Sequence, residues 1–489
     1  MKKYITRAAL VLLGTFSLVS CGDEFLDTNF SNSEQQAPIT TVEKLQSFVY
    51  GNYATMRDFN YYGNYFITTS EVRSDEMYSN NRSGYHSSTM NYTMVSSDAI
   101  ATGAWTAMYT VVAKANTIIN TSDNLSWSQT QNAAVISEKV KYLKGQAYAL
   151  RAQAFFDLLR LYGQKYTQSP SQLGVVLPLQ YNPAANMPRA TIAQTEAQIA
   201  ADFDKAYQLL NGNSNNVYTD KTVLNDYSVQ ALMSRFYLYK GDYAKVRSLV
   251  ASIVGSGKWS IIPADSFAGS FGLNNAAPNS MFELAVGSSV TIAPSINDLY
   301  NPNGAYKNMP VKTAIYNSYT STDVRKSAFG TATGLAGRFI AAKYPTLNSD
   351  TNIRMVRYEE VLLNGIEAEL NGGDPAKARG YFVSLLQNRL KDLKDPNDVI
   401  VQTVAQQIET YLSTLDMTKL KAERAKELVG EGFRYWDQLR WGDVIKKNIT
   451  TGGTNGNATL NLLAFPIPQA ETNVSGSLVV PNPGYDNSL

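Results

Sequence analysis

The only cysteine of the chain lies where one kind of lipid chemistry needs a thiol. Cys21 follows a basic start and an uninterrupted run of apolar and small residues over 8–19. This run is too short to span a bilayer, but it has the length of the apolar core of a signal peptide. A cysteine directly behind such a core is typical of bacterial lipoproteins, in which the sulfur takes a diacylglyceryl group and the chain is cleaved just before it. We therefore predict a signal peptide over 1–20 and a lipidated tether over 21–38, the alternative being an ordinary secretory signal.

Side chains that could carry out catalysis are few. The chain has one histidine, His86, which excludes the usual zinc sites and catalytic triads, and a lone histidine in a polar loop is expected at the surface. Carboxylate pairs for glycoside hydrolysis stay open, with Asp75–Glu76 and Glu359–Glu360 as the obvious candidates. Neighbouring residues on a helix point about 100° apart, so neither pair is arranged for acid/base work. The sequence thus predicts a protein that is not an enzyme, with no catalytic residue, no metal site and no cofactor.

Length and composition exclude several other classes. The chain has 489 residues, of which 44% are hydrophobic, so it can bury a large core and is not mostly disordered. Lys and Arg number 43 against 41 Asp and Glu, and this balance excludes a strongly basic nucleic-acid binder. Charged residues make up 17% of the chain, below the usual share of roughly 25%, so the surface depends on neutral polar groups.

Helical periodicity dominates the rest of the chain. Apolar residues recur at three- and four-residue steps over 137–162, which predicts one long helix with a buried face. Helices are also expected from Thr41 onward and over 103–120. Two further segments, 227–246 and 359–378, each read as a helix, a Gly-Asp turn and a second helix. This order is typical of tetratricopeptide-like hairpins.

Two segments lack that periodicity. About 57–97 carries many Tyr, Asn and Ser residues, and about 255–347 is rich in Gly, Asn, Ser and Pro. Loops of this size inside a folded domain are more often functional than idle. We therefore predict a mostly α-helical single large domain over 39–489, with tetratricopeptide-like helical hairpins and a loop-rich insert that contributes minor β-structure.

A segment near the C-terminus carries a family resemblance. Residues 423–442 read ERAKELVGEGFRYWDQLRWG and resemble the C-terminal signature of the SusD/RagB family, surface lipoproteins that serve nutrient uptake across bacterial outer membranes. Shorter resemblances follow in the family's order along nearly the whole chain, among them Trp105 to Asn116, Asn279 to Glu283 and Asn482 to Tyr485. In this order, behind a lipoprotein signal, they identify the chain as similar to this family.

The signature also has a physical interpretation. Spacing along a helix predicts ion pairs between Glu431 and Arg434 and between Asp437 and Arg440. Five apolar residues fall on one broad helical face, and we expect them to be buried and to act as scaffold rather than as ligand contacts. They are Leu428, Val429, Phe433, Trp436 and Leu439.

The resemblance implies a function as well as a fold. It implies a binding protein held in the cell outer membrane by its lipid anchor, exposed at the surface, and seated as a hinged lid on a SusC-like TonB-dependent β-barrel transporter. Acidic residues just behind Cys21 are similar to the surface-export signal of such lipoproteins. The implied ligand is an oligosaccharide or, as in the RagB branch, an oligopeptide. A surface glycoside hydrolase and a purely structural transporter subunit stay open as alternatives.

The expected ligand face lies in the two aperiodic segments. A neutral oligosaccharide needs flat rings against its C–H faces and a few amides, guanidinium groups or carboxylates for its hydroxyls. The family places part of its ligand face on an acidic residue and an arginine that correspond here to Asp75 and Arg82. Each ring taken singly has ordinary packing as its alternative, and Trp105 is expected in the core. The predicted contacts are Tyr61, Tyr62, Tyr65, Asp75, Tyr78, Asn80, Asn81, Arg82, Tyr85, Tyr92, Tyr300 and Tyr306. Sugar-binding members rely on Trp in these regions, and no Trp precedes Trp105, so the oligopeptide alternative remains.

Overall fold

The computed structural model describes residues 38–182, 184–287, 290, 292–345, 351–474 and 476–487. The chain divides into two parts, residues 1–40 and 41–489, and the fold described below is that of the second part. The predicted signal peptide, Cys21 and nearly all of the predicted tether lie outside the described residues.

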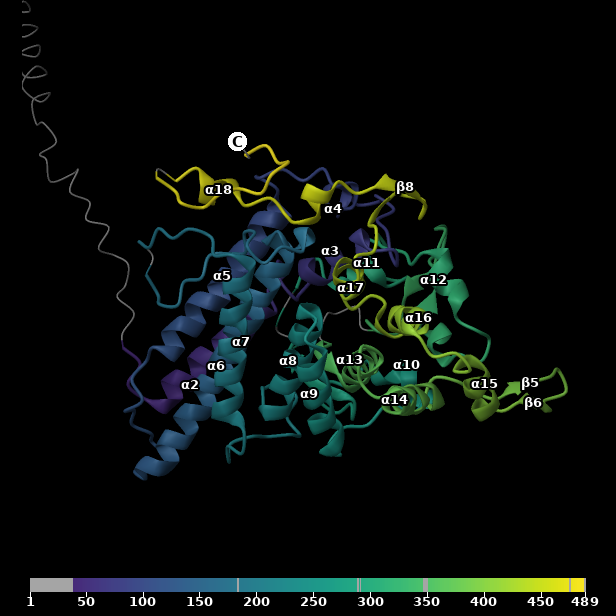
Figure 1. The fold of residues 1–489 in the computed structure, drawn as a ribbon, viewed down its shortest axis with the longest axis horizontal. Coiled ribbons are helices and arrows are strands. Elements are labelled where there is room, and N and C mark those ends of the chain that lie inside the picture. The colour runs from purple at the N-terminus through teal and green to yellow at the C-terminus, as the bar shows by residue number, and fades with distance from the viewer. Residues whose placement is uncertain are drawn as a thin grey trace, which may run out of the picture. The chain divides into compact units, whose positions relative to one another are not determined.

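The second part is mostly α-helical, as predicted (Figure 1). Its longer helices are α2 (Val42–Met56), α3 (Tyr65–Arg73), α5 (Ala99–Ile119), α6 (Ala133–Tyr162), α7 (Ile192–Leu210), α8 (Asp226–Lys240), α9 (Tyr243–Gly255), α13 (Tyr358–Leu370), α14 (Pro375–Gln387), α15 (Val404–Tyr411), α16 (Met417–Leu428) and α17 (Arg434–Arg440). Shorter helices are α4 (Ser87–Asn91), α10 (Phe267–Ser270), α11 (Ile296–Tyr300), α12 (Thr313–Ser318), α18 (Gln469–Thr472) and the 3₁₀ turns η2 (Lys165–Thr167), η3 (Ala264–Ser266), η4 (Val324–Ala328) and η5 (Leu460–Leu463).

The long helices begin where side chains cap them. The Thr41 hydroxyl accepts a hydrogen bond from the Lys44 amide at 3.2 Å, so the predicted start of α2 is confirmed. Helices α5 and α6 cover the predicted segments 103–120 and 137–162, and both begin earlier than predicted. Helix α6 packs between α5 and α7 and carries the apolar face that the periodicity indicated (Figure 1). Trp105 on α5 is 4% exposed, which confirms its place in the core.

The two predicted hairpins are α8–α9 and α13–α14. Gly241 ends α8 at a φ of +83°, a left-handed conformation that a residue without Cβ adopts at no steric cost. The next residue, Asp242, then caps α9 by accepting from the Lys245 amide at 3.0 Å. Asp374 caps α14 in the same way, from the Ala376 amide at 2.9 Å. Helices α9 and α13 pack against each other, so the hairpins form consecutive layers.

The β-structure is minor, as predicted, and consists within the described residues of four two-stranded antiparallel sheets. Only one has strands longer than four residues: β1 in the insert pairs with β4 beyond it, so this sheet ties the insert to α13. The strands are β1 (Ser280–Leu284), β2 (Phe329–Gly330), β3 (Phe339–Ile340), β4 (Ile353–Arg357), β5 (Leu393–Lys394), β6 (Ile400–Gln402), β7 (Lys446–Asn448) and β8 (Thr454–Asn457).

The signature segment is scaffold, but it is not one continuous helix. Glycines 430 and 432 have φ values of +80° and +83° and separate α16 from α17. Of the five apolar residues expected to be buried, Leu428, Val429 and Trp436 are at most 3% exposed, whereas Phe433 and Leu439 are half-buried. The break in the helix explains the difference, because a single helical face does not extend across both glycines.

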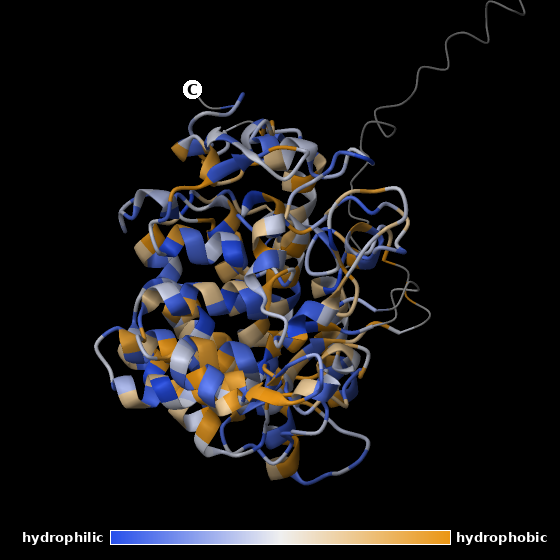
Figure 2. Ribbon diagram, turned by 90° about the vertical axis from the view of Figure 1, so that its right-hand side faces the viewer, coloured by the Kyte–Doolittle hydropathy of each residue, from blue (hydrophilic) through white to orange (hydrophobic). Residues whose placement is uncertain are grey.

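Charged groups are also buried beneath this segment. The guanidinium groups of Arg325, Arg357 and Arg389 are at most 2% exposed, and all three hydrogen-bond to the carboxylate of Glu427 on α16. Hydrophobic and hydrophilic residues are mixed along the helices in Figure 2, as expected of helices that bury one face and expose the other. None of the helices in the described part of the chain combines the length and the apolarity that a membrane span requires.

Candidate functional site

The two aperiodic segments meet in space. Met77 forms an isolated antiparallel bridge with Val311, and the Asn80 amide donates to the carbonyl of Asn308 at 2.9 Å. These two chain segments are more than 220 residues apart in the sequence. The two predicted ligand-face segments therefore come together in one surface at 77–85 and 306–311, next to α4 and α11 (Figure 1).

Asn308 organises this surface, and sequence reasoning missed it. Its side chain is 0% exposed and accepts a hydrogen bond from the Ser83 hydroxyl at 2.8 Å. Its amide nitrogen donates to the Tyr85 carbonyl at 2.9 Å and to the Ser79 hydroxyl at 3.1 Å. One buried amide thus fixes the backbone of the 79–85 loop from beneath. Nothing in the sequence distinguishes this asparagine from the others in the insert.

Five predicted contacts lie in the two chain segments that Asn308 joins. The rings of Tyr85 and Tyr306 meet edge to face, with centroids 5.1 Å apart, and both are half-buried. Burial raises the pKa of Tyr85, and the neighbouring Tyr306 adds to that rise, so the phenol stays protonated at neutral pH. Asn81 and Arg82 are exposed in the same loop as Tyr85, and the Arg82 backbone amide donates to the Asn80 side chain at 3.0 Å. We call Asn80, Asn81, Arg82, Tyr85 and Tyr306 the Tyr85–Tyr306 face.

The backbone is left-handed at two positions, one in this face and one beside it. Asn81 and Lys307 adopt left-handed conformations with φ values of +60° and +49°. Asparagine adopts such a conformation readily, whereas lysine does so rarely and only where the surroundings fix it. For Lys307 the surroundings are α11, because the amides of both Tyr306 and Lys307 donate to the Asp298 carbonyl at 2.9 Å. The face is thus preorganised rather than loose.

Six of the predicted contact rings lie instead in the interior. Tyr61 and Tyr62 both donate their hydroxyls to the buried carboxylate of Asp157 on α6, at 2.7 Å for Tyr62. A ring that is less than a tenth exposed offers too little area to stack on a ligand, so the expectation of ligand contact does not hold for these six tyrosines in this conformation. The exposed fractions are 0% for Tyr61, 5% for Tyr62, 9% for Tyr65, 7% for Tyr78, 7% for Tyr92 and 0% for Tyr300.

The other buried tyrosines have specific packing partners. Tyr65 packs on Phe59, with ring centroids 4.2 Å apart. Tyr92 lies under the guanidinium of buried Arg73, 4.4 Å from the ring centroid, which is a cation–π contact. Tyr300 packs edge to face on Tyr344 at 5.3 Å. These tyrosines therefore pack in the interior of the protein, which was the alternative to ligand contact.

Asp75 is exposed and paired. It accepts two hydrogen bonds from the Arg434 guanidinium, at 2.7 and 2.9 Å, across 359 residues of sequence. The predicted pair between Glu431 and Arg434 is therefore wrong: Glu431 pairs instead with Lys343 and Arg357, because the break at Gly432 separates it from α17. The predicted pair between Asp437 and Arg440 is confirmed at 2.8 Å.

Three of the four carboxyl groups considered for hydrolysis are engaged in hydrogen-bonded ion pairs, and the fourth, Glu76, is buried. Glu359 accepts from Arg389 at 2.8 Å, and Glu360 pairs with Arg235 at 2.6 Å, both at 1% exposure or less. Glu76 is 1% exposed, and its carboxyl lies 3.9 Å from Arg434. In the described part of the chain no three His, Cys, Asp or Glu residues are grouped so that they could hold a metal ion.

His86 corrects another expectation, because it is buried rather than at the surface. It is 1% exposed, its Nε2 lies 2.9 Å from the Thr68 hydroxyl, and its Nδ1 has no hydrogen-bond partner among the described residues. Burial lowers the pKa of this imidazole to about 3. The ring packs edge to face on Tyr65 at 5.6 Å, so it supports the Tyr-rich loop from inside.

We predict that His86 makes the fold sensitive to acid. In the unfolded chain the imidazole of His86 binds a proton near pH 6.5, but in the folded chain it does so only near pH 3. The neutral, buried imidazole therefore contributes fully to stability above pH 6.5, and this contribution is lost as the pH falls toward 3. At pH 5 the expected loss is about 2 kcal/mol. Since the chain has one histidine, its ring proton resonance can be followed directly by NMR. An imidazole that titrates near pH 6.5 in the folded protein would contradict the prediction.

Comparisons with known proteins cover most of the chain. Residues 24–238 match a family model described as starch-binding associating with outer membrane, and residues 288–485 match the SusD family model. SusD-like protein P38 of Formosa agariphila is 23% identical over 430 residues, which cover 76% of this chain and 79% of that protein. SusD-like protein P2 of the same organism is 28% identical over 169 residues, 33% of this chain and 30% of that protein. This second match thus spans less than a third of the relative's own length.

Solved structures share the fold. A SusD superfamily protein from Bacteroides thetaiotaomicron has a TM-score of 0.78 and 24% identity, covering 91% of this chain and 100% of that one. Surface glycan-binding protein A from the same organism, in complex with laminarihexaose, has a TM-score of 0.67 and 18% identity, with coverages of 91% and 100%. At these identities the likeness concerns the fold.

Proposed function

The chain belongs to the SusD/RagB family, and from this premise we propose that it binds oligosaccharides at the cell surface through the Tyr85–Tyr306 face. One observation carries the proposal: the two half-buried rings are displayed together on a pair of loops that also carries an exposed amide and an exposed guanidinium group. Rings of this kind fit the C–H faces of sugars, while the polar groups can bond to the hydroxyls. That a protein of this fold holds laminarihexaose supports the same ligand class.

The wider role that we propose is capture and transfer. The protein would be anchored in the outer membrane through a lipidated Cys21 and would act as the lid of a SusC-like TonB-dependent transporter, to which it passes the bound oligosaccharide. A hinged lid that carries its ligand onto a plugged barrel is a known kind of gating movement. The carboxylates considered for hydrolysis are ion-paired or buried, which supports binding without cleavage.

Tyr85→Ala and Tyr306→Ala should each weaken oligosaccharide binding by about 10-fold, because each removes one ring of the platform. Calorimetry with a panel of neutral oligosaccharides and a panel of mixed peptides measures the effect and the ligand class together. The matched control is Tyr181→Ala, since Tyr181 is 66% exposed and lies outside the face. Binding of peptides alone would select the oligopeptide alternative, and binding that both ring variants leave unchanged would contradict the proposed face.

Cys21→Ser should release the protein from the membrane fraction. The thiol is the atom that the proposed lipid would modify, and stable anchoring requires more than one acyl chain. Fractionation of cells and labelling of surface proteins measure the outcome. Retention of the variant at the surface would contradict a lipid anchor while leaving the proposed ligand face untouched.

A further inference from the structure

Further chain segments adjoin the surface that carries the Tyr85–Tyr306 face. Val311 forms antiparallel bridges with both Met77 and Arg338, so the chain around Arg338 lies beside the two segments already described. The side-chain amide of Asn448, on β7, donates to the Met77 carbonyl at 3.1 Å and thereby joins the β7–β8 hairpin to the same surface. The segments that come together here are 77–85, 306–340 and 446–457.

These three segments are rich in positive charge. They hold eight Lys and Arg residues and one acidic residue, whereas the formal net charge of the whole chain is only +2. Two of the eight, Lys312 and Arg325, are buried. We call the other six, which are exposed or half-buried, the six surface cations. They are Arg82, Lys307, Lys326, Arg338, Lys446 and Lys447.

The acidic groups at this surface are already engaged. Asp323, the one acid of the three segments, is 4% exposed and pairs with buried Arg325 at 2.7 Å. At the border of the surface, Asp75 pairs with Arg434. Asp298 accepts two hydrogen bonds at the start of α11, at 2.9 and 3.1 Å. Within the part of the chain that the structure describes, none of the six surface cations takes part in an ion pair, so an anion could reach them without displacing a carboxylate.

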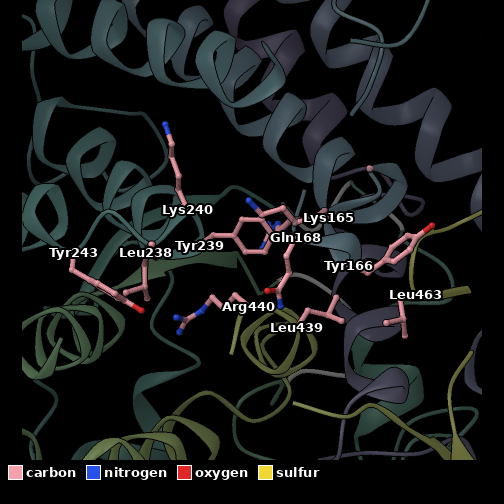
Figure 3. A pocket seen from close by; sticks show the side chains of 13 residues that line it. Lys165, Tyr166, Gln168, Leu238, Tyr239, Lys240, Tyr243, Leu439, Arg440 and Leu463 are labelled. Carbon is pink, nitrogen blue, oxygen red and sulfur yellow. The ribbon is translucent and has the colours of Figure 1, made fainter. Parts of the chain in front are cut away.

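The pocket shown in Figure 3 differs in this respect, although it too is lined by cations. It lies where η2, the C-terminal end of α8 and α17 come together, and it has a volume of about 210 Å³. Three of its four cations, Arg160, Lys165 and Arg440, are paired with carboxylates. The fourth, Lys240, is exposed and points away from Lys165 and Arg440 in Figure 3. This pocket is therefore not suited to an anion, whereas the surface around the Tyr85–Tyr306 face is.

Two of the six surface cations are held against one aromatic ring. The guanidinium of Arg338 lies 4.7 Å from the centroid of the Tyr316 ring on α12, and the ammonium of Lys326 lies 5.2 Å from it. Lys326 also donates one of its three N–H groups to the Tyr319 carbonyl at 3.2 Å. Tyr316 packs edge to face on Phe329 at 5.8 Å, and both rings are half-buried. We call Tyr316, Lys326, Phe329 and Arg338 the Tyr316 cluster.

A guanidinium and an ammonium group placed together fit an oxyanion. The planar guanidinium matches such a group with two parallel hydrogen bonds, and the ammonium adds a point charge. Neutral sugars carry no oxyanion, whereas sugar acids carry carboxylates and sulfated sugars carry sulfate esters. A surface with an excess of one charge also attracts ligands of the opposite charge and speeds their association.

We propose that the oligosaccharide bound at this surface is anionic, and that its carboxylate or sulfate groups bind to Arg338 and Lys326 of the Tyr316 cluster while its rings contact the Tyr85–Tyr306 face. This inference rests on the proposed function, because it names the class of oligosaccharide that the same surface takes.

The test is calorimetry on the full chain with two matched pairs of hexasaccharides. Hexagalacturonic acid is compared with its methyl ester, and sulfated cellohexaose is compared with cellohexaose, so each pair differs only in the charged group. At low salt, at least one anion should bind about 10-fold more tightly than its neutral partner, and salt should reduce this preference. The pair that shows the preference identifies the group as carboxylate or sulfate.

Variants of the Tyr316 cluster test where the anion binds. Arg338→Gln and Lys326→Gln should each weaken binding of the anion by about 3- to 10-fold and change binding of the neutral partner by less than about 2-fold. Arg338→Lys keeps the charge but loses the planar fork, so its effect should be smaller than that of Arg338→Gln. Thermal melting checks that the variants fold. The matched control is Lys377→Gln, because Lys377 is exposed on α14, outside the three segments.

Two results would overturn the inference. In the first, neither anion binds more tightly than its neutral partner. In the second, Lys377→Gln weakens binding of the anion as much as Arg338→Gln does, which would mean that the overall charge of the protein suffices. Failure of the proposed function looks different: Tyr85→Ala and Tyr306→Ala would then leave the binding of charged and neutral oligosaccharides alike unchanged.

Discussion

Glu427→Gln should lower the free energy of unfolding by about 3–5 kcal/mol, because it leaves buried guanidinium groups without their shared anion. The carboxylate is 0% exposed and accepts hydrogen bonds from Arg389 at 2.8 and 3.0 Å, from Arg357 at 3.0 Å and from Arg325 at 3.1 Å. Urea unfolding followed by circular dichroism measures the loss. The substitution keeps the size of the side chain, so the effect reports the charge rather than a cavity.

A matched control separates this buried network from ordinary surface pairs. Glu409 pairs with Arg379 at 2.6 Å, but its side chain is 70% exposed. Glu409→Gln should therefore change stability by no more than about 1 kcal/mol. Equal effects of the two substitutions would mean that the buried arginines do not depend on Glu427.

Glu427 also determines how the stability of the protein changes at acidic pH. Although burial opposes it, the guanidinium groups of Arg389 and Arg357 hold the pKa of Glu427 well below its ordinary value. Its contribution is therefore present above the unfolded pKa of about 4.5 and is lost as the pH falls through the lower folded value. The Glu427→Gln variant lacks that group, so its stability should depend less steeply on pH below about 4.5 than that of the parent chain.

Much of the fold could be predicted because apolar residues recur every three to four positions along a helix with one buried face. The apolar face of α6 and the Gly-Asp turns at 241–242 and 373–374 depend only on residues that are close together in the sequence. They can therefore be recognised without knowledge of the tertiary structure. The pair that we predicted between Glu431 and Arg434 shows where local features are not sufficient. Helical spacing predicts that these two residues pair only if the helix is continuous. The positive φ values of Gly430 and Gly432 interrupt it and separate α16 from α17.

The candidate site could be predicted only as two segments, not as a surface. Residues in loops have no period, so whether a tyrosine is buried depends on partners far away in the sequence. Tyr62 finds its partner Asp157 at a separation of 95 residues, and Asn308 finds Ser83 at a separation of 225. Composition therefore indicated two segments that meet in space, while the contacts divided their tyrosines into buried packing residues and the half-buried pair of Tyr85 and Tyr306.

Tyr61→Ala should lower the free energy of unfolding by about 3–5 kcal/mol, as expected when a buried aromatic ring is deleted. The ring is 0% exposed, lies 4.5 Å from that of Tyr62 and 5.7 Å from that of Phe66, and its hydroxyl donates to Asp157. Tyr61→Phe keeps the packing and should cost about 1.5–3 kcal/mol, the value of a hydrogen bond to a charged group.

The control lies in the same loop. Tyr85 is half-buried and belongs to the Tyr85–Tyr306 face, so Tyr85→Ala should change stability by about 1 kcal/mol or less while weakening ligand binding. Chemical unfolding and calorimetry on the same preparations give both quantities. If Tyr61→Ala instead weakened oligosaccharide binding and left stability unchanged, the Asp157 cluster would have to open when ligand binds. The division between packing and contact tyrosines would then be wrong.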